Sequence, residues 1–88
     1  MSKPLILLGD KTDHGGVVIE ASKFSDVGGK GIARIGDKVT CPKRGHGETT
    51  VIATGDPTMI VDGMPVARHG DKTACGAILI SSQIVTTD

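Results

Sequence analysis

The chain has 88 residues, with ten basic and ten acidic side chains and a formal net charge of zero. Chains of this length usually form one domain, so we expect a single domain over residues 1–88. The balanced charge leaves no basic excess to neutralise phosphates, which argues against a nucleic-acid-binding protein. Phe24 is the only aromatic residue. The core must therefore use smaller side chains, and so small a core usually needs a staple such as a metal or a disulfide.

The first apolar stretch, "LILL" at residues 5–8, ends at Gly9. It is shorter than the roughly 7–15 apolar residues of a signal peptide and much shorter than the roughly 20 of a membrane span. We therefore expect synthesis in the cytoplasm, without a signal peptide and without a stable membrane anchor. A reducing cytoplasm argues against a disulfide between Cys41 and Cys75 as the staple.

Short strands and turns are predicted for the rest, because thirteen glycines and four prolines interrupt the chain and leave little room for helices. β-branched residues predict strands at residues 16–21 ("GVVIEA"), 49–54 ("TTVIAT"), 58–67 ("TMIVDGMPVA") and 77–85 ("AILISSQIV"). The last segment is predicted as one strand or as two with a break near Ser81-Ser82. Asp62-Gly63 predicts a two-residue hairpin turn inside the third of these segments. The glycine-rich residues 24–33 are predicted to be a loop. The fold class is therefore all-β.

One phrase occurs three times along the chain. "GDKTDHGG" begins at Gly9, "GDKVTCP" at Gly36 and "GDKTACG" at Gly70, with intervals of 27 and 34 residues. Such repetition predicts three similar turns around an approximate axis. In each turn the glycine supplies an unusual φ, and the aspartate after it accepts hydrogen bonds from the turn's own backbone. We expect Arg34 and Arg68, which precede the second and third phrases, to pair with carboxylates.

All histidines and cysteines of the chain lie in these phrases or next to them: His14, Cys41, His46, His69 and Cys75. Imidazole and thiolate ligands suit zinc, which takes four of them in a closed structural site. Two sets of four are reasonable. Both contain His14, His69 and Cys75, and they differ in whether His46 or Cys41 completes the site. The position within the repeat favours Cys41, because His14, Cys41 and Cys75 each stand five residues after the glycine of their own phrase.

The main alternative is a small zinc-dependent hydrolase. Catalytic zinc needs an open coordination position and a nearby general acid or base, but Glu48 is the only glutamate near a candidate ligand and no predicted helix orients it. A Cys–His nucleophile pair would need a third orienting group and a cleft. A redox or metal-buffer protein is a further alternative, which predicts easy metal loss and thiol oxidation. We favour a structural metal.

The ordered set of motifs "GDKTDHGG", "GIARIGDKVTCP", "GHG", "VDGMPVARHGDKTACG" and "AILISSQ" resembles the PAAR family, whose members cap the spike of type VI secretion machines. The resemblance covers about residues 8–83. The family takes its name from a Pro-Ala-Ala-Arg tetrapeptide, and the corresponding positions here read "PVAR" at residues 65–68 and, more loosely, "GIAR" at residues 31–34.

This resemblance implies a small pyramidal, cone-shaped domain of short strands and hairpins with pseudo-threefold symmetry and one structural Zn²⁺ near its tip. It implies three histidines and one cysteine as ligands, which favours the set His14, His46, His69 and Cys75, with Cys41 as the rival to His46. It also implies a structural protein and not an enzyme. One such chain would sit by its base on the trimeric spike protein VgrG.

The family resemblance further implies export by the secretion machine to the extracellular space or a target cell. The match spans nearly the whole chain, so we expect no fused effector domain, although a separate effector could ride on the flank. Apolar residues left over from so small a core would supply the contact with the spike. The candidates come from the two apolar runs and are Leu5, Ile6, Leu7, Leu8, Ala77, Ile78, Leu79 and Ile80.

Overall fold

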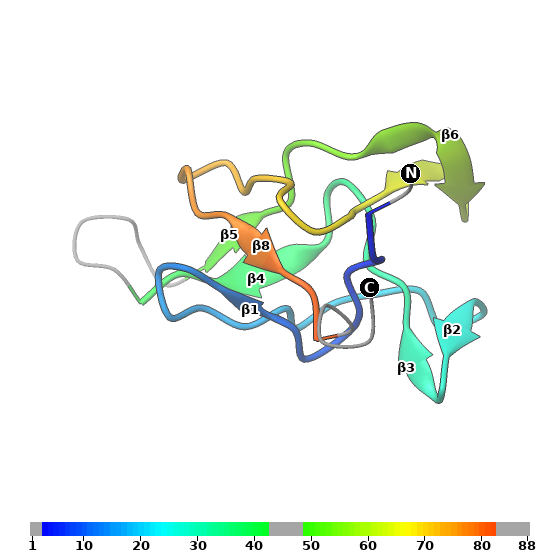
Figure 1. Cartoon of the computed structure of the whole chain (residues 1–88), viewed down its shortest axis with the longest axis horizontal. Helices are drawn as coiled ribbons and strands as arrows, with labels where there is room; N and C mark the ends of the chain where they lie inside the picture. Colours follow the sequence, from blue (N-terminus) through cyan, green and yellow to red (C-terminus); the bar gives the residue numbers. More distant parts are fainter. Residues whose placement is uncertain (1–2, 43–48, 83–88) are drawn as a thin grey trace.

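The computed structural model describes residues 3–42 and 49–82. These residues contain short strands and no helix, which confirms the all-β class. The strands are β1 (Lys11–Thr12), β2 (Asp26–Val27), β3 (Lys30–Gly31), β4 (Lys38–Thr40), β5 (Thr49–Val51), β6 (Asp56–Val61), β7 (Met64–Val66) and β8 (Leu79–Ile80). They form the antiparallel pairs β1–β8, β2–β3, β4–β5 and β6–β7 (Figure 1).

The Gly-Asp pairs make three copies of one turn. The glycine φ is +90° at Gly9 and +92° at both Gly36 and Gly70, a region that residues with a side chain avoid. The aspartate amide donates to the carbonyl three residues earlier at 2.9–3.0 Å, and its carboxylate Oδ2 accepts from the amide of that same residue at 2.8 Å. The aspartates are Asp10, Asp37 and Asp71, and their partners are Leu7, Arg34 and Arg68.

A closed ring of backbone hydrogen bonds joins the three repeats. The Ile6 amide donates to the Ala67 carbonyl, the Ala67 amide to the Ala33 carbonyl, and the Ala33 amide to the Ile6 carbonyl, each at 2.9 Å. These residues stand three positions before the three turn glycines, so they are equivalent in the repeat. The chain thus has pseudo-threefold symmetry, and the axis passes through this ring.

The core lies around the ring. Its main cluster is made of small aliphatic side chains: Ile6, Val18, Ala33, Val39, Ile52, Ala67 and Leu79. Phe24, the largest apolar side chain of the sequence, is 88% exposed and contributes nothing to it. A buried aliphatic side chain of this size contributes about 1.5–3 kcal/mol. So few buried side chains give a modest core, which agrees with the expectation that a metal or a disulfide is needed to stabilise the fold.

Two hairpins lie away from the repeated turns. The β6–β7 hairpin turns at Asp62 and Gly63, whose φ angles are +52° and +82°, as the Asp-Gly pair predicted. The expected loop at residues 24–33 is wrong, because β2 and β3 pair there across a turn at Gly28 and Gly29, both with positive φ. The Ser22 hydroxyl donates to Asp62 Oδ2 at 2.6 Å and so joins the turn of the β6–β7 hairpin to the segment that leads into β2.

Two further strand predictions are only partly right. Residues 16–21 form no strand, although Val17 and Val18 make isolated bridges to neighbouring segments. Of the predicted strand at 77–85, the described part contains β8 alone, and residues 83–85 lie outside the described residues. Where the structure describes the chain, no helix is long and apolar enough to span a membrane.

Candidate metal centre

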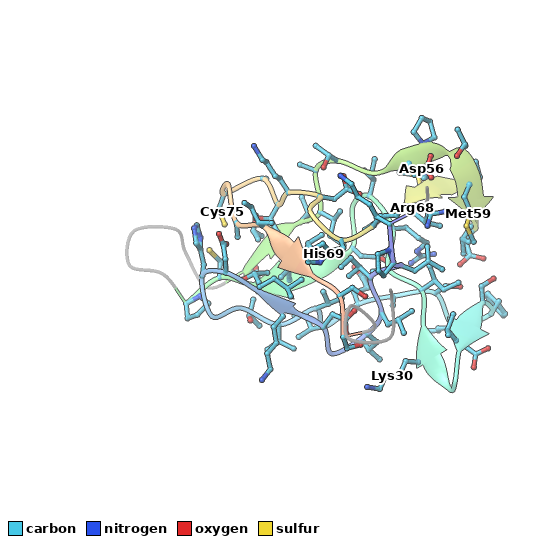
Figure 2. The ribbon with its side chains drawn as sticks, in the orientation of Figure 1. Lys30, Asp56, Met59, Arg68, His69 and Cys75 are labelled. Atoms are coloured by element: carbon cyan, nitrogen blue, oxygen red, sulfur yellow. The ribbon has the colours of Figure 1, made fainter. Side chains whose placement is uncertain are left out.

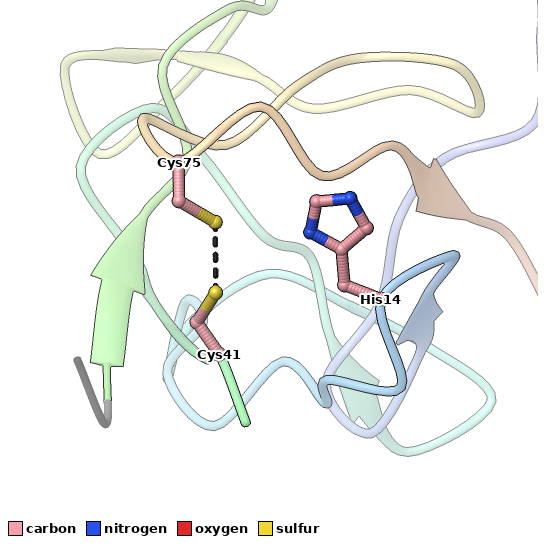
Figure 3. Close-up of side chains that lie close together, drawn as sticks. All are labelled: His14, Cys41 and Cys75. Carbon is pink, nitrogen blue, oxygen red and sulfur yellow. Dashed lines mark hydrogen bonds between the residues drawn. The ribbon is translucent and has the colours of Figure 1, made fainter. Parts of the chain in front are cut away.

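Three ligand-type side chains meet at one end of the molecule. His14, Cys41 and Cys75 each offer a ligand atom, and these atoms all lie within 4.8 Å of one another (Figure 3). Each follows its own Gly-Asp turn by five residues counted from the glycine. The structure therefore brings together the three positions that the repeat phase aligns, and they come from three different repeats.

The first and third ligands are presented by two copies of the same loop. In each copy the threonine two residues before the ligand holds the loop closed. The Thr12 amide donates to the Gly16 carbonyl at 3.0 Å, and the Thr12 hydroxyl accepts from the Gly16 amide at 2.9 Å. Thr73 makes the same two bonds with Ala77, at 2.9 and 3.1 Å. A glycine with positive φ follows each ligand, +82° in one loop and +88° in the other.

Cys41 reaches the group from the end of β4. The Thr40 amide donates to the Val17 carbonyl and the Thr40 hydroxyl accepts from the Val17 amide, both at 2.8 Å. The two backbones can pack so closely because Gly16 has no side chain, since a Cβ there would lie 2.0 Å from the Thr40 carbonyl oxygen. This contact places Cys41 beside the first ligand loop, with 1% of its surface exposed.

The donor set suits a borderline or soft metal. It contains one imidazole and two cysteines that are not joined in a disulfide, the ligand types that zinc takes in structural sites. Zinc bonds of about 2.0–2.3 Å would place neighbouring ligand atoms about 3.3–3.8 Å apart. The two sulfurs lie 2.9 Å apart, so they would have to separate by about 0.9 Å to bind one zinc ion. The Thr73 hydroxyl lies 3.2 Å from the Cys75 sulfur and can orient it.

The two remaining histidines are placed differently. The Nδ1 atom of His69 accepts a hydrogen bond from the Ser81 amide at 3.1 Å. His69 occupies the repeat position of Leu8 and Ile35, inside the turn itself, and it is not part of the convergent group. His46 lies outside the described residues.

The apolar residues expected to contact a partner divide into two kinds. Four of them fill the interior with 0–3% exposure: Ile6, Leu7, Ala77 and Leu79. Leu8, Ile78 and Ile80 are 38–41% exposed. Leu5 is half-buried and packs against a second core cluster, which is made of Leu7, Ile32, Val61 and Val66. Burial alternates along residues 77–80, as expected for extended chain in which successive side chains point to opposite faces. In the first run, Ile6 and Leu7 are adjacent and both buried.

Both arginines of the repeats pair with carboxylates, as expected. Arg34 bonds Asp37 at 2.8 Å and Asp62 at 2.7 Å, and the hydrogen bond with Asp37 raises the pKa of Arg34. Arg68 bonds Asp56 at 2.7 Å (Figure 2). These ion pairs connect the turns to the β6–β7 hairpin, away from the three convergent ligands.

Thr12 and Thr73 were not singled out by the sequence reasoning, which stopped at the ligands. A signal for them exists, because "Thr-x-His-Gly" and "Thr-x-Cys-Gly" recur at the same repeat phase. A hydroxyl two residues before a ligand and a glycine after it mark a closed loop. Aligning the repeats beyond their Gly-Asp-Lys phrases would have identified both threonines.

The fold and the site define a class of protein: a small all-β domain with pseudo-threefold turns and a group of one histidine and two cysteines that could hold a metal ion. The family model for the PAAR motif matches residues 8–81, and the chain belongs to this family. The PAAR family is a structural spike-protein family. Membership supports a role associated with the spike tip of a type VI secretion system and implies a spike protein as partner. No curated protein matches the chain.

Proposed function

We propose that this protein caps the trimeric VgrG spike of a type VI secretion system, with one chain on each trimer. The observation that carries the proposal is the closed ring of Ile6, Ala33 and Ala67, which gives a single chain an internal threefold arrangement. A partner with three equivalent chains offers three equivalent surfaces around its axis. A monomer can meet all three alike only if its own backbone repeats three times.

The contact surface in this proposal is the end of the molecule that carries the two hairpins. Figure 2 shows Cys75 at one end of the long axis, with Met59 of β6 and Lys30 of β3 at the other. Two large apolar side chains are exposed: Phe24 at 88%, in the segment that leads into β2, and Ile60 of β6 at 53%. The proposal takes them as parts of one apolar contact patch, the kind of surface that marks a protein–protein interface. In this proposal the hairpin end contacts the spike, in place of the exposed residues Leu8, Ile78 and Ile80 of the two apolar runs.

The metal has a structural role in the proposal. The convergent loops contain few buried apolar side chains, and turns of this kind open easily without a further tie. Zn²⁺ bound by His14, Cys41 and Cys75 would join the three repeats at the end away from the hairpins. Structural zinc contributes on the order of 10 kcal/mol of folding-linked free energy in small domains. His46, the rival of Cys41 in the sequence-based sets, lies outside the described residues.

The proposed role as a spike cap also implies where the protein is made and how it is exported. We propose that it is made in the cytoplasm and leaves with the spike when the machine fires, towards the extracellular space or a target cell. A separate effector could be attached to its flank, since the hairpin end and the metal end have other roles. No enzymatic step is needed for this function, in line with a family of structural spike proteins.

Co-purification with the trimeric spike protein tests the proposal directly. Tagged VgrG is co-expressed with the chain, and the mass of the complex is measured in solution. One chain per trimer supports capping. Three chains per trimer, or no complex, would refute it.

The contact surface is tested separately in the same assay. Phe24→Asp and Ile60→Asp should weaken capture at least about tenfold, which corresponds to 1.4 kcal/mol. Ile78→Asp is the matched control, because the Ile78 side chain is 38% exposed and belongs to an apolar run that the sequence predicted as a contact with the spike. Weak capture of Ile78→Asp together with normal capture of the two hairpin variants would move the contact to the apolar runs.

A further inference from the structure

The two cysteines of the metal group lie in direct contact. Their sulfur atoms are 2.9 Å apart (Figure 3), and the residues are not joined in a disulfide. A disulfide bond is about 2.05 Å long, so an approach of about 0.9 Å would bring the sulfurs to bonding distance. These are the only cysteines of the chain, and within one molecule each can pair only with the other.

The backbone holds this pair in place on both sides. The Thr40 amide, next to Cys41, donates to the Val17 carbonyl at 2.8 Å, and the Ala74 amide, next to Cys75, donates to the Val51 carbonyl at 2.8 Å. These two bonds occupy equivalent positions in the second and third repeats. The sulfurs therefore meet where the second and third repeats converge.

The two thiols differ in access. Cys41 is 1% exposed, whereas Cys75 is half-buried and lies on the outer side of the pair. An oxidant from solution will meet Cys75 first. Cys41, shielded but in contact, is then placed to attack the sulfur of Cys75.

We propose that Cys41 and Cys75 are an oxidation site, which forms an intrachain disulfide when no metal occupies the two sulfurs and a small disulfide is available as oxidant. The thiolate of Cys75 attacks one sulfur of oxidised glutathione and displaces one glutathione thiolate, which gives a mixed disulfide. The thiolate of Cys41 then attacks the Cys75 sulfur and displaces the second glutathione thiolate. The protein loses two protons and two electrons, and the oxidant becomes two glutathione molecules.

Metal binding and oxidation therefore exclude each other, because both use the same sulfur atoms. Either state still joins the second repeat to the third, across 34 residues of chain. The disulfide does not include His14, so in the oxidised state the first repeat is joined to the other two by hydrogen bonds and packing but not through its ligand side chain. The site goes beyond the proposed spike function, because the chemistry needs neither the spike nor secretion.

The test uses the full chain in three states: zinc-loaded, metal-free and metal-free in denaturant. Each is incubated with oxidised glutathione, quenched with an alkylating reagent and analysed by intact mass. The folded metal-free chain should lose two hydrogens and accept no alkyl group. It should do so at least about tenfold faster than the denatured chain, because folding raises the effective concentration of one thiol at the other. The zinc-loaded chain should keep two alkylatable thiols.

Variants define the order of the two steps. Cys41→Ser should stop at the mixed disulfide and gain the mass of one glutathione. Cys75→Ser should react much more slowly, since its remaining thiol is buried. His14→Ala should still form the disulfide, because His14 takes no part in it.

Two free thiols, glutathione adducts or cross-linked dimers as the main products of the folded metal-free chain would overturn the proposal, as would equal rates with and without denaturant. None of these results bears on capture by VgrG, so the two proposals fail independently.

Discussion

His14 and His69 carry the same imidazole at different phases of the repeat. His14 follows the first Gly-Asp turn and meets the two cysteines, whereas His69 lies inside the third turn and accepts a hydrogen bond from Ser81. Chemical type alone does not separate these roles, since both residues stand close to a Gly-Asp pair. The position of each histidine relative to the turn glycine separates the two roles, because it decides which way the residue faces around the pseudo-threefold axis.

The first prediction follows from that difference. His14→Ala should lower zinc affinity by more than the roughly 10–100-fold that loss of a supporting second-shell group costs, because it removes a ligand. His69→Ala should leave the metal content unchanged and lose only the bond from Ser81. Metal analysis of the purified variants, with a competing chelator, measures both. Equal metal loss in the two variants would return His69 to the ligand set.

Asp56 gives a prediction on pH. The hydroxyl and amide of Thr58 and the guanidinium of Arg68 hold the pKa of Asp56 at about 2, below its ordinary value of 3.8. The folded state therefore favours the charged form. Its stabilising effect is complete above about pH 4 and is lost as the pH falls towards about 2.

Thermal denaturation of the wild type and Asp56→Asn at several pH values measures this effect. The variant should melt at a lower temperature at pH 7, and the difference should shrink as the pH falls through about 2 and vanish below it, where Asp56 is protonated in both states. Asp26→Asn, on the other hairpin, controls for a general loss of surface charge. A difference between wild type and Asp56→Asn that stays constant with pH would contradict the assignment.

The elements that matter most here are turns, and their glycines act for two different reasons. Gly36 has a φ of +92° and open space where a Cβ would stand, whereas Gly16 faces the Thr40 carbonyl at 2.0 Å from such a Cβ. Gly36→Ala should therefore cost about 1–2 kcal/mol from backbone strain alone. Gly16→Ala should cost more, on the order of 3 kcal/mol, since two backbones must move apart.

Chemical denaturation of the two variants compares these costs. Gly9→Ala is the matched control for Gly36→Ala, because its turn has the same φ to within a few degrees and the same open space. We expect similar shifts in the denaturation midpoint for those two. A larger loss for Gly36→Ala than for Gly16→Ala would show that the contact with Thr40 relaxes easily.

The sequence predicted the turns well and the strands less well. The Gly-Asp turns and the Asp62-Gly63 hairpin depend on local chemistry, a positive φ and a carboxylate near its own backbone, and such features repeat wherever the residues do. The β2–β3 hairpin was missed because Gly28 and Gly29 indicate a loop unless the pairing of the two flanking residues on each side is known. The convergence of His14, Cys41 and Cys75 followed from repeat phase, but the closed loops at Thr12 and Thr73 required the hydrogen bonds.

At the scale of the whole molecule, the metal group lies at one end and the backbone ring lies in the core. Near the ligands, the Asp13, Thr40 and Ala74 amides donate between repeats at 2.8–3.0 Å. Deeper in the core, the ring of Ile6, Ala33 and Ala67 does the same. Loss of the metal should loosen the first set much more than the second, because only the first lies next to the ligands.

Amide hydrogen exchange with and without a chelator, under reducing conditions, tests this prediction. Protection should fall at least about tenfold at Asp13, Thr40 and Ala74 and change less at Ile6, Ala33 and Ala67. Zinc added back in excess is the control and should restore the original protection. A uniform loss across both sets would mean that the metal supports the fold as a whole, and no change at either set would remove its structural role.

The three repeats share the backbone ring but carry different outer segments, and this difference affects how the protein is oriented on a threefold partner. The backbone ring repeats three times, but the β2–β3 hairpin, the β6–β7 hairpin and the segment around Leu5 differ from one another. On a homotrimer, three placements rotated by 120° are the same complex, and this degeneracy favours association by RT ln 3, about 0.65 kcal/mol. Anything attached to one flank therefore emerges beside any one of three identical spike chains. Its direction is random from one assembled spike to the next, and averaging over the symmetry of the spike would erase it.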